Sequence, residues 1–224
     1  MAVSFYLMSE NARPKRRYDD TGRRRQADAT RERVIAAAAQ AFLEHGYAAA
    51  TVPAIAAEAG VALRTLYRAA PGKAGLLAAA VRAAVAGGVA REEVPVDDRP
   101  AIRAIIDEPD PRRQLALYAH TQPGIWARVG PLLRVLDAAA DSEPELRQLQ
   151  REEDSQRHDG LIRFARLLHE RGGLRDDLTP ERAADIIVTL GSFATFDSLV
   201  TTHGWTHDQY ETWLADTLQH SLLD

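Results

Sequence analysis

Apolar residues recur at intervals of three and four along almost the whole chain after Ala27, and no stretch alternates apolar and polar residues for long enough to form a strand. Intervals of three and four place side chains on one face of an α-helix, whereas a half-buried strand requires a period of two. The pattern therefore predicts an all-α protein, and it shows no internal repeat.

The first part of the pattern predicts three short helices. A helix over about 28–45 should end before Gly46, because glycine readily adopts the left-handed conformation that terminates helices. A second helix should begin after Thr51, whose side-chain oxygen can serve as the N-cap, and end at Gly60. A third short helix is predicted over Leu63–Ala69.

Longer helices are predicted for the second part of the chain. An apolar-periodic segment runs over about 73–93, and Ser142-x-x-Glu145 is a candidate capping box for another helix. The last two helices, predicted over 179–202 and 206–223, have broad apolar stripes. We therefore expect the second part to be a bundle of antiparallel helices.

The charge of the chain is divided unevenly. Residues 1–73 hold 12 Lys and Arg against 7 Asp and Glu, whereas residues 74–224 hold 16 against 25, although the whole chain carries only −4. A basic first part can neutralise the phosphates of a polyanion while an acidic second part stays clear of it. A solvated basic tail would give the same charge division, so charge alone leaves both interpretations open.

The composition excludes several kinds of site. The chain has no cysteine, which rules out disulfides, thiolate zinc sites, iron–sulfur clusters and cysteine nucleophiles. Its longest run without Lys, Arg, Asp or Glu, residues 114–127, is shorter than the roughly 20 apolar residues that span a bilayer. We expect a cytoplasmic protein without a membrane partner.

Residues 51–68 have the layout of a helix-turn-helix motif. Small residues at Ala56, Ala57 and Ala59 allow two helices to cross closely, and Gly60 can supply the positive φ of the turn. The second helix then exposes side chains that can bond base edges or phosphates in a major groove: Arg64, Thr65, Tyr67 and Arg68. A buried helical hairpin would not need so polar an outer face.

The segment over about residues 28–77 resembles the N-terminal signature of the TetR family of transcriptional regulators. The matching positions are Arg33-Val34-Ile35, Ala37-Ala38, Phe42, Gly46-Tyr47, Thr51-Val52, Ile55-Ala56, Ala59-Gly60-Val61, Thr65-Leu66-Tyr67-Arg68, Lys73 and Leu76-Leu77. Two positions depart from the family pattern. Ala62 stands where a Ser or Thr N-cap is common, and Ala69-Ala70 replaces a polar and aromatic pair.

The resemblance implies a role for each matching residue on DNA. Thr51 would bond a phosphate, Tyr67 would contact the backbone and a thymine methyl group, and Lys73 would meet a phosphate beside a helix N-terminus. The residues expected nearest the bases are Leu63, Arg64 and Thr65, with Arg68 on the same exposed face.

The resemblance also implies the organisation of the whole chain. Residues 1–26 would form a basic, disordered arm, residues 27–73 the helix-turn-helix DNA-binding domain, and residues 74–224 a helical ligand-binding and dimerisation domain. A homodimer through the last two helices would bind a palindromic operator in double-stranded DNA. A small molecule of unknown identity would release this repressor from its operator.

The ligand site implied by the resemblance should involve the segment over about 100–172. Its large or polar-tipped side chains suit an apolar pocket with a few orienting groups, although packing or surface roles would explain each of them as well. These candidates are Tyr118, His120, Trp126, Phe164 and His169.

Other classes of function have weaker support. The seven histidines are scattered, no catalytic triad, phosphate loop or dinucleotide fingerprint is present, and we expect no catalytic residue, metal or cofactor. Asp154 and His158 lie one turn apart on a predicted helix, as His203 and His207 do by spacing, but an ion pair or a cap explains either pair more simply. A helical-bundle enzyme or metal-binding protein without a DNA-binding role stays the alternative, and a purely structural bundle leaves Arg64 and Tyr67 unexplained.

Overall fold

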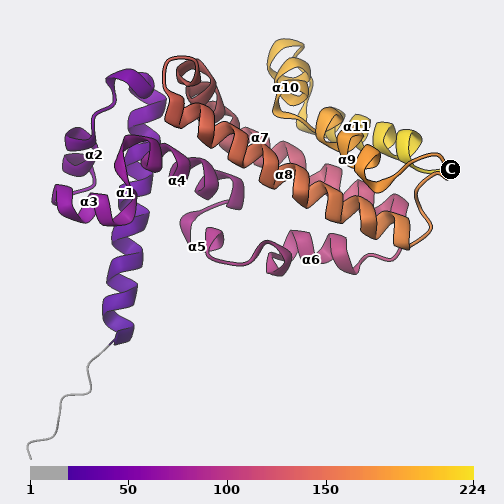
Figure 1. The fold of residues 1–224 in the computed structure, drawn as a ribbon, viewed down its shortest axis with the longest axis horizontal. Helices are drawn as coiled ribbons and strands as arrows, with labels where there is room; N and C mark the ends of the chain where they lie inside the picture. The colour runs from indigo at the N-terminus through magenta and orange to yellow at the C-terminus, as the bar shows by residue number, and fades with distance from the viewer. Residues whose placement is uncertain (1–19) are drawn as a thin grey trace, which may run out of the picture.

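The computed structural model describes residues 20–224, and this part of the chain contains helices and no strand. The all-α prediction is confirmed. Figure 1 shows a small group of helices, the head, at one end of an elongated helical body. The helices are α1 (Asp20–Ala49), α2 (Val52–Glu58), α3 (Leu63–Ala69), α4 (Gly72–Ala86), α5 (Val89–Glu92), η1 (Val96–Asp98), α6 (Pro100–Asp107), α7 (Pro111–Ala140), α8 (Pro144–Glu170), α9 (Pro180–Leu190), α10 (Phe193–Phe196), η2 (Asp197–Thr202) and α11 (His207–Leu222).

The head consists of α1, α2 and α3 around one apolar core. The helical backbone of α1 breaks at Gly46, with φ 71° and ψ 175°, at the predicted position. Phe42 is fully buried and stacks on Tyr47 with ring centroids 5.8 Å apart. Ile55 from α2 and Leu66 from α3 are also fully buried. Because each helix contributes a large side chain to this core, α2 and α3 are fixed relative to α1.

Helix α1 begins earlier than the sequence pattern predicted. It starts at Asp20 instead of about residue 28, so residues 20–26 are helical and are not the irregular arm that we expected. This stretch contains Arg23, Arg24, Arg25 and Gln26, residue types that favour helix even without an apolar stripe. Residues 22–29 are all exposed, and the start of α1 projects from the head (Figure 1). The basic residues Arg13 to Arg17 lie outside the described residues.

Helix α7 is the centre of the body. It packs against α1 and α4 on the side of the head and against α8 and α11 on the other. Asp110 caps its start by accepting a hydrogen bond from the backbone N–H of Arg112 at 2.9 Å. The helix contains a buried stripe that includes Leu115, Tyr118 and Trp126. One helix therefore contacts both ends of the molecule.

A chain of charged side chains joins the head to the body. Arg31 on α1 and Arg82 on α4 both bond the carboxylate of Glu92, at 3.0 and 3.1 Å. A second nitrogen of Arg82 lies 3.8 Å from a carboxylate oxygen of Glu153 on α8. These contacts of alternating charge connect α1, α4, α5 and α8. In addition, the guanidinium of Arg128 on α7 donates a hydrogen bond to the carbonyl oxygen of Ala84, near the end of α4, at 3.1 Å.

The segment 179–202 is not the single helix that we predicted. Helix α9 ends at Leu190, and Ser192 caps the short α10, after which the backbone continues as the π-helix η2. At this break a Cβ on Gly191 would lie 2.9 Å from the Tyr118 hydroxyl, so α7 leaves no room for a side chain at this position. Pro180–Thr202 is long and apolar enough to cross a membrane by length and composition, a property that core helices of soluble proteins share, and 28% of its most apolar window is buried.

We predict that neutralising Glu153 stabilises the protein at neutral pH. Burial raises the pKa of this carboxyl despite the attraction of Arg82. A raised folded-state pKa means that the ionised form opposes folding above that pKa, and that the penalty disappears as the pH falls below the unfolded value. Glu153→Gln should raise stability by less than about 1 kcal/mol at pH 7.5, because the group is partly solvated.

Urea unfolding at pH 7.5 and pH 4 measures this effect. The gain from Glu153→Gln should vanish at pH 4, and Asp159→Asn, exposed on the same helix, serves as the control. A loss of stability at pH 7.5 would show that the contact with Arg82 outweighs the cost of burial.

Candidate nucleic-acid interface

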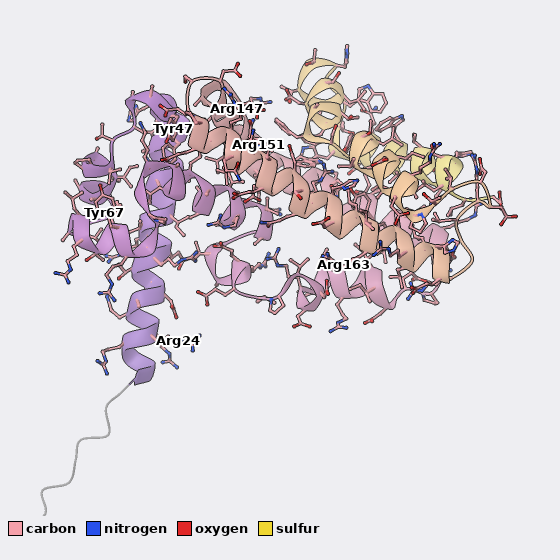
Figure 2. The ribbon with its side chains drawn as sticks, viewed as in Figure 1. Arg24, Tyr47, Tyr67, Arg147, Arg151 and Arg163 are labelled. Carbon is pink, nitrogen blue, oxygen red and sulfur yellow. The ribbon has the colours of Figure 1, made fainter. Side chains whose placement is uncertain are left out.

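Helix α3 presents a polar and aromatic face to solvent. Tyr67 and Leu63 are 54% and 44% exposed, and Arg64 and Arg68 are exposed as well. Thr65 is half-buried at the edge of this face. Figure 2 shows Tyr67 on the outer side of α3, away from the body. Within residues 20–224 neither arginine of α3 forms an ion pair, so both guanidinium groups are available to an external anion.

The turn before α3 determines which way this face points. Gly60 adopts φ 64°, a left-handed conformation that favours glycine. The N–H groups of Gly60 and Val61 donate to the carbonyls of Ala57 and Ala56 at 3.1 and 3.0 Å, which closes the end of α2. Leu66, fully buried beneath the turn, anchors α3 to the core. The exposed face of α3 is therefore held rigidly outward.

The start of α3 lacks a side-chain cap. Ala62 occupies the N-cap position and makes no capping hydrogen bond, as the sequence led us to expect. By contrast, the hydroxyl oxygen of Thr51 accepts from Ala54 N at 3.3 Å at the start of α2. Thr51 is exposed, and its hydroxyl proton stays free to be donated to a phosphate.

Lys73 has a structural role that the sequence did not reveal. Its ammonium donates to Ala48 O at 3.0 Å and lies 4.4 Å from the centre of the Tyr47 ring. These contacts tie the start of α4 to the end of α1. Since an ammonium group has three N–H donors, Lys73 can hold this position and still bond a phosphate.

The ligand candidates of the body divide into two groups. Tyr118 and Trp126 are buried along α7, and Phe164 from α8 stacks on Tyr118 with ring centroids 5.5 Å apart. His120 is instead on the surface, with 72% of its side chain exposed and an ion-pair contact to Glu211 at 2.9 Å. His169 is exposed too. The structure thus brings three of the five candidates together.

Helical spacing explains why the two histidines do not belong with the others. His120 follows Tyr118 by two residues, which turns its side chain about 200° around α7. His169 follows Phe164 by five residues, which turns it about 140° around α8. A check of helical phase would have removed both from the list of pocket residues.

Sequence reasoning missed Arg157 and Tyr210, which lie with Tyr118 and Trp126. The Arg157 guanidinium carbon is 5.0 Å from the centre of the Trp126 ring, and one of its nitrogens donates to Gly191 O at 2.6 Å. Burial raises the pKa of Tyr118, and the facing Arg157 offsets part of that rise. Arg157 was missed because it lies in a highly charged helical segment, where most side chains are solvated.

The two residue pairs with metal-ligand spacing have other contacts in the structure. His158 Nε2 lies 2.9 Å from a carboxylate oxygen of Asp185 on α9, so its partner is not Asp154. His207 instead packs its ring against Phe196, with centroids 5.7 Å apart. Within residues 20–224 no group of three or more His, Cys, Asp or Glu is arranged to hold a metal ion.

The head matches a known family of DNA-binding domains. Residues 34–80 match the family of bacterial regulatory proteins called the tetR family. None of the curated proteins matches the chain significantly. The matched segment contains all of α2 and α3, the adjoining part of α1 and the start of α4.

The whole fold is similar to solved structures of bacterial transcriptional regulators and repressors. A TetR-family transcriptional regulator from Mesorhizobium loti matches with a TM-score of 0.67 and 18% identity over 89% of this chain and 99% of that one. NalD from Pseudomonas aeruginosa, the secondary repressor of the MexAB-OprM multidrug efflux pump, gives 0.67 and 21% over 88% and 98%. FadR from Bacillus subtilis, solved with stearoyl-CoA, gives 0.62 and 19% over 83% and 96%. At these identities the similarity shows the fold.

We predict that Ala62→Ser stabilises the protein by about 1 kcal/mol, because a serine side chain at this N-cap can accept a backbone N–H of α3. Urea unfolding at a fixed protein concentration measures the gain. Ala138→Ser, exposed within α7, should lose a few tenths of a kcal/mol and serves as the control. Equal stabilities of the two variants would show that α3 gains nothing from a cap.

Proposed function

The chain carries the helix-turn-helix domain of the TetR family, and on that premise we propose that it is a dimeric transcriptional repressor, acting in the cytoplasm, that a small molecule releases from a palindromic operator. The observation that carries the proposal is the unpaired, exposed face of α3, held outward by the Gly60 turn and the buried Leu66. A face with two free guanidinium groups and a free phenol suits duplex DNA.

In this proposal α3 enters the major groove. Arg64, near the exposed start of α3, would bond base edges, with Leu63 and Thr65 beside it. Tyr67 and Arg68 would contact the backbone, and Thr51 would donate its hydroxyl proton to a phosphate. Arg24 on the projecting start of α1 (Figure 2) and its exposed neighbour in the sequence, Arg25, add positive charge to the head. Residues 27–73 would act as the DNA-binding domain and residues 74–224 as the ligand-binding and dimerisation domain.

The proposed dimer forms through α9 and α11. Trp205 and Trp213 are only partly buried and meet edge to face, with ring centroids 6.2 Å apart. They border an open surface groove of about 450 Å³, which is lined by Trp205, Asp208, Gln209, Thr212, Trp213 and Asp216. Aromatic side chains at the centre of a polar-edged patch are typical of interfaces. Two heads related by a two-fold axis would bind half-sites about 34 Å apart.

The contacts between head and body suggest how a ligand would act. Helix α8 reaches α4 through Glu153 and Arg82, and α4 is joined to α1 through Glu92 and Arg31. A ligand that shifts α8 would change the support of α4 and hence the spacing of the two heads. By thermodynamic linkage, a ligand that weakens DNA binding must itself bind more weakly to the DNA-bound dimer.

We predict that selection from random duplex DNA with the full chain enriches a palindrome. Arg64→Ala should weaken binding of that palindrome by about 1–3 kcal/mol and relax the preference at one position in each half-site. Tyr67→Ala should weaken binding as well, with the dimer intact. Fluorescence anisotropy at several salt concentrations measures both effects.

Arg151→Ala, exposed on α8 at a distance from α3 (Figure 2), is the control for lost positive charge. A chain that selects no sequence, or an Arg64→Ala variant that binds like the control variant, would count against the proposed interface.

We predict that Trp213→Glu converts the dimer to a monomer, because an uncompensated charge in a buried apolar interface is costly. Size-exclusion chromatography with light scattering at micromolar concentration measures the mass. Ala104→Glu, exposed on α6, should stay dimeric. A dimeric Trp213→Glu variant with unchanged circular dichroism would place the interface elsewhere.

A further inference from the structure

Four polar side-chain ends converge inside the body, between α7, α8 and α11. They are the guanidinium of Arg157, the indole N–H of Trp126 and the hydroxyls of Tyr118 and Tyr210. The pKa of Tyr210 is raised far above its usual value, mainly by burial and then by Tyr118, while Arg157 and Trp126 offset part of the rise. Arg157 lies 5.0 Å from the centre of the Trp126 ring, and the influence of Arg157 on both tyrosines indicates that the four groups are neighbours.

Two of these groups have no hydrogen-bond partner. Tyr210 is fully buried and Trp126 is 6% exposed, yet neither the Tyr210 hydroxyl nor the Trp126 indole nitrogen makes a hydrogen bond. The indole N–H influences Tyr210 without reaching hydrogen-bond geometry. A buried polar group without a hydrogen-bond partner destabilises the folded protein. Two such groups near each other indicate that a bound molecule supplies their hydrogen-bond partner.

The charge of the cluster is also unbalanced. Arg157 is half-buried, and no carboxylate among the described residues pairs with it. Its contacts are the carbonyl of Gly191, the Tyr118 hydroxyl and the face of Trp126. An Arg guanidinium is always charged and offers five N–H donors in a planar fork that matches a carboxylate. The cluster therefore has an excess of donors and one unpaired positive charge.

We propose that this cluster, which we call the donor cluster (Tyr118, Trp126, Arg157 and Tyr210), binds the carboxylate of an apolar monocarboxylic acid. One guanidinium balances one negative charge, which favours a carboxylate over a phosphate dianion. The carboxylate oxygens would accept from Arg157, Trp126 and Tyr210. The inference rests on the proposed function, since it assigns a chemical class to the effector of that regulator.

The surroundings of the donor cluster fit the apolar part of such an acid. The ring of Phe193 lies 5.9 Å from that of Trp126, and Phe196 meets Tyr210 edge to face at 5.1 Å. Both phenylalanines belong to the segment 193–202, which includes the π-helix η2 and is bounded by Gly191 and Gly204. Short π-helices occur often at functional sites. The body of the acid would occupy the space of Phe193, which is half-buried, when this short segment moves outward.

Isothermal titration of the full chain without DNA tests the assignment. The probes are hexanoate, octanoate, decanoate, phenylacetate and 4-phenylbutyrate, each compared with its neutral primary amide. At least one acid should bind at least tenfold more tightly than its amide. If no acid binds more tightly than its amide, the proposal is wrong.

Two variants separate recognition from packing. Tyr210→Phe removes a hydroxyl that has no protein partner. This variant should keep or raise the melting temperature, and its affinity for the acid should fall at least threefold. Arg157→Met should lower the affinity for the acid at least tenfold. Arg163→Met, at an exposed position on the same helix (Figure 2), should leave that affinity unchanged. A lower melting temperature for Tyr210→Phe together with unchanged acid affinity would mean that the hydroxyl bonds a trapped water, and would overturn the proposal.

The acid titrations and the DNA selection test separate proposals, so either proposal can be rejected while the other is upheld. Acid binding that depends on Arg157 in a chain that selects no DNA sequence would uphold the donor cluster and reject the repressor. A selected palindrome with no acid binding would uphold the regulator and reject the donor cluster as a carboxylate site.

Discussion

The packing of α7 is the constraint on which the rest of the structure depends. Its 30 residues contact α1 and α4 near the head and α8 and α11 in the body, so one rigid rod spans the molecule. A close-packed interior cannot deform continuously, and a shift on one side of α7 must move a neighbour on the other. Arg128, which bonds the end of α4, is a direct link between this helix and the support of the head. The orientation of α3 in space follows from α7 as much as from its own turn.

Two half-buried charged side chains lie on helix α8. Glu153 and Arg157 are one turn apart on it, the first facing Arg82 and the second facing Tyr118. A charge is unfavourable at both positions. Burial raises the pKa of Glu153, and no carboxylate among the described residues pairs with Arg157. Evolution of a purely structural bundle would favour apolar residues at such places. Their presence connects the donor cluster to the junction between head and body through a single helical turn.

The local sequence was sufficient to predict the main features of the head, but it was not sufficient to predict those of the body. The turn at Gly60, the cap at Thr51 and the missing cap at Ala62 depend on residues a few positions apart, and each prediction is confirmed. In the body, Tyr118, Trp126 and Phe164 lie together, whereas His120 and His169 lie on the surface, because a choice by residue type takes no account of helical phase. The break after α9 and the early start of α1 were missed, because neither follows from an apolar stripe.

By itself the sequence determined the helical class, the helix-turn-helix and its outward polar face, because spacing, glycine conformation and capping act over a few residues. Only the tertiary structure decided that Arg157 meets Trp126 and Tyr118, that Lys73 holds Ala48 O and Tyr47, and that Glu92 joins two arginines. These contacts join residues that are between 10 and 61 positions apart in the sequence. Whether a charge there is solvated or buried depends on which helices pack around it, and periodicity along one helix does not contain that information.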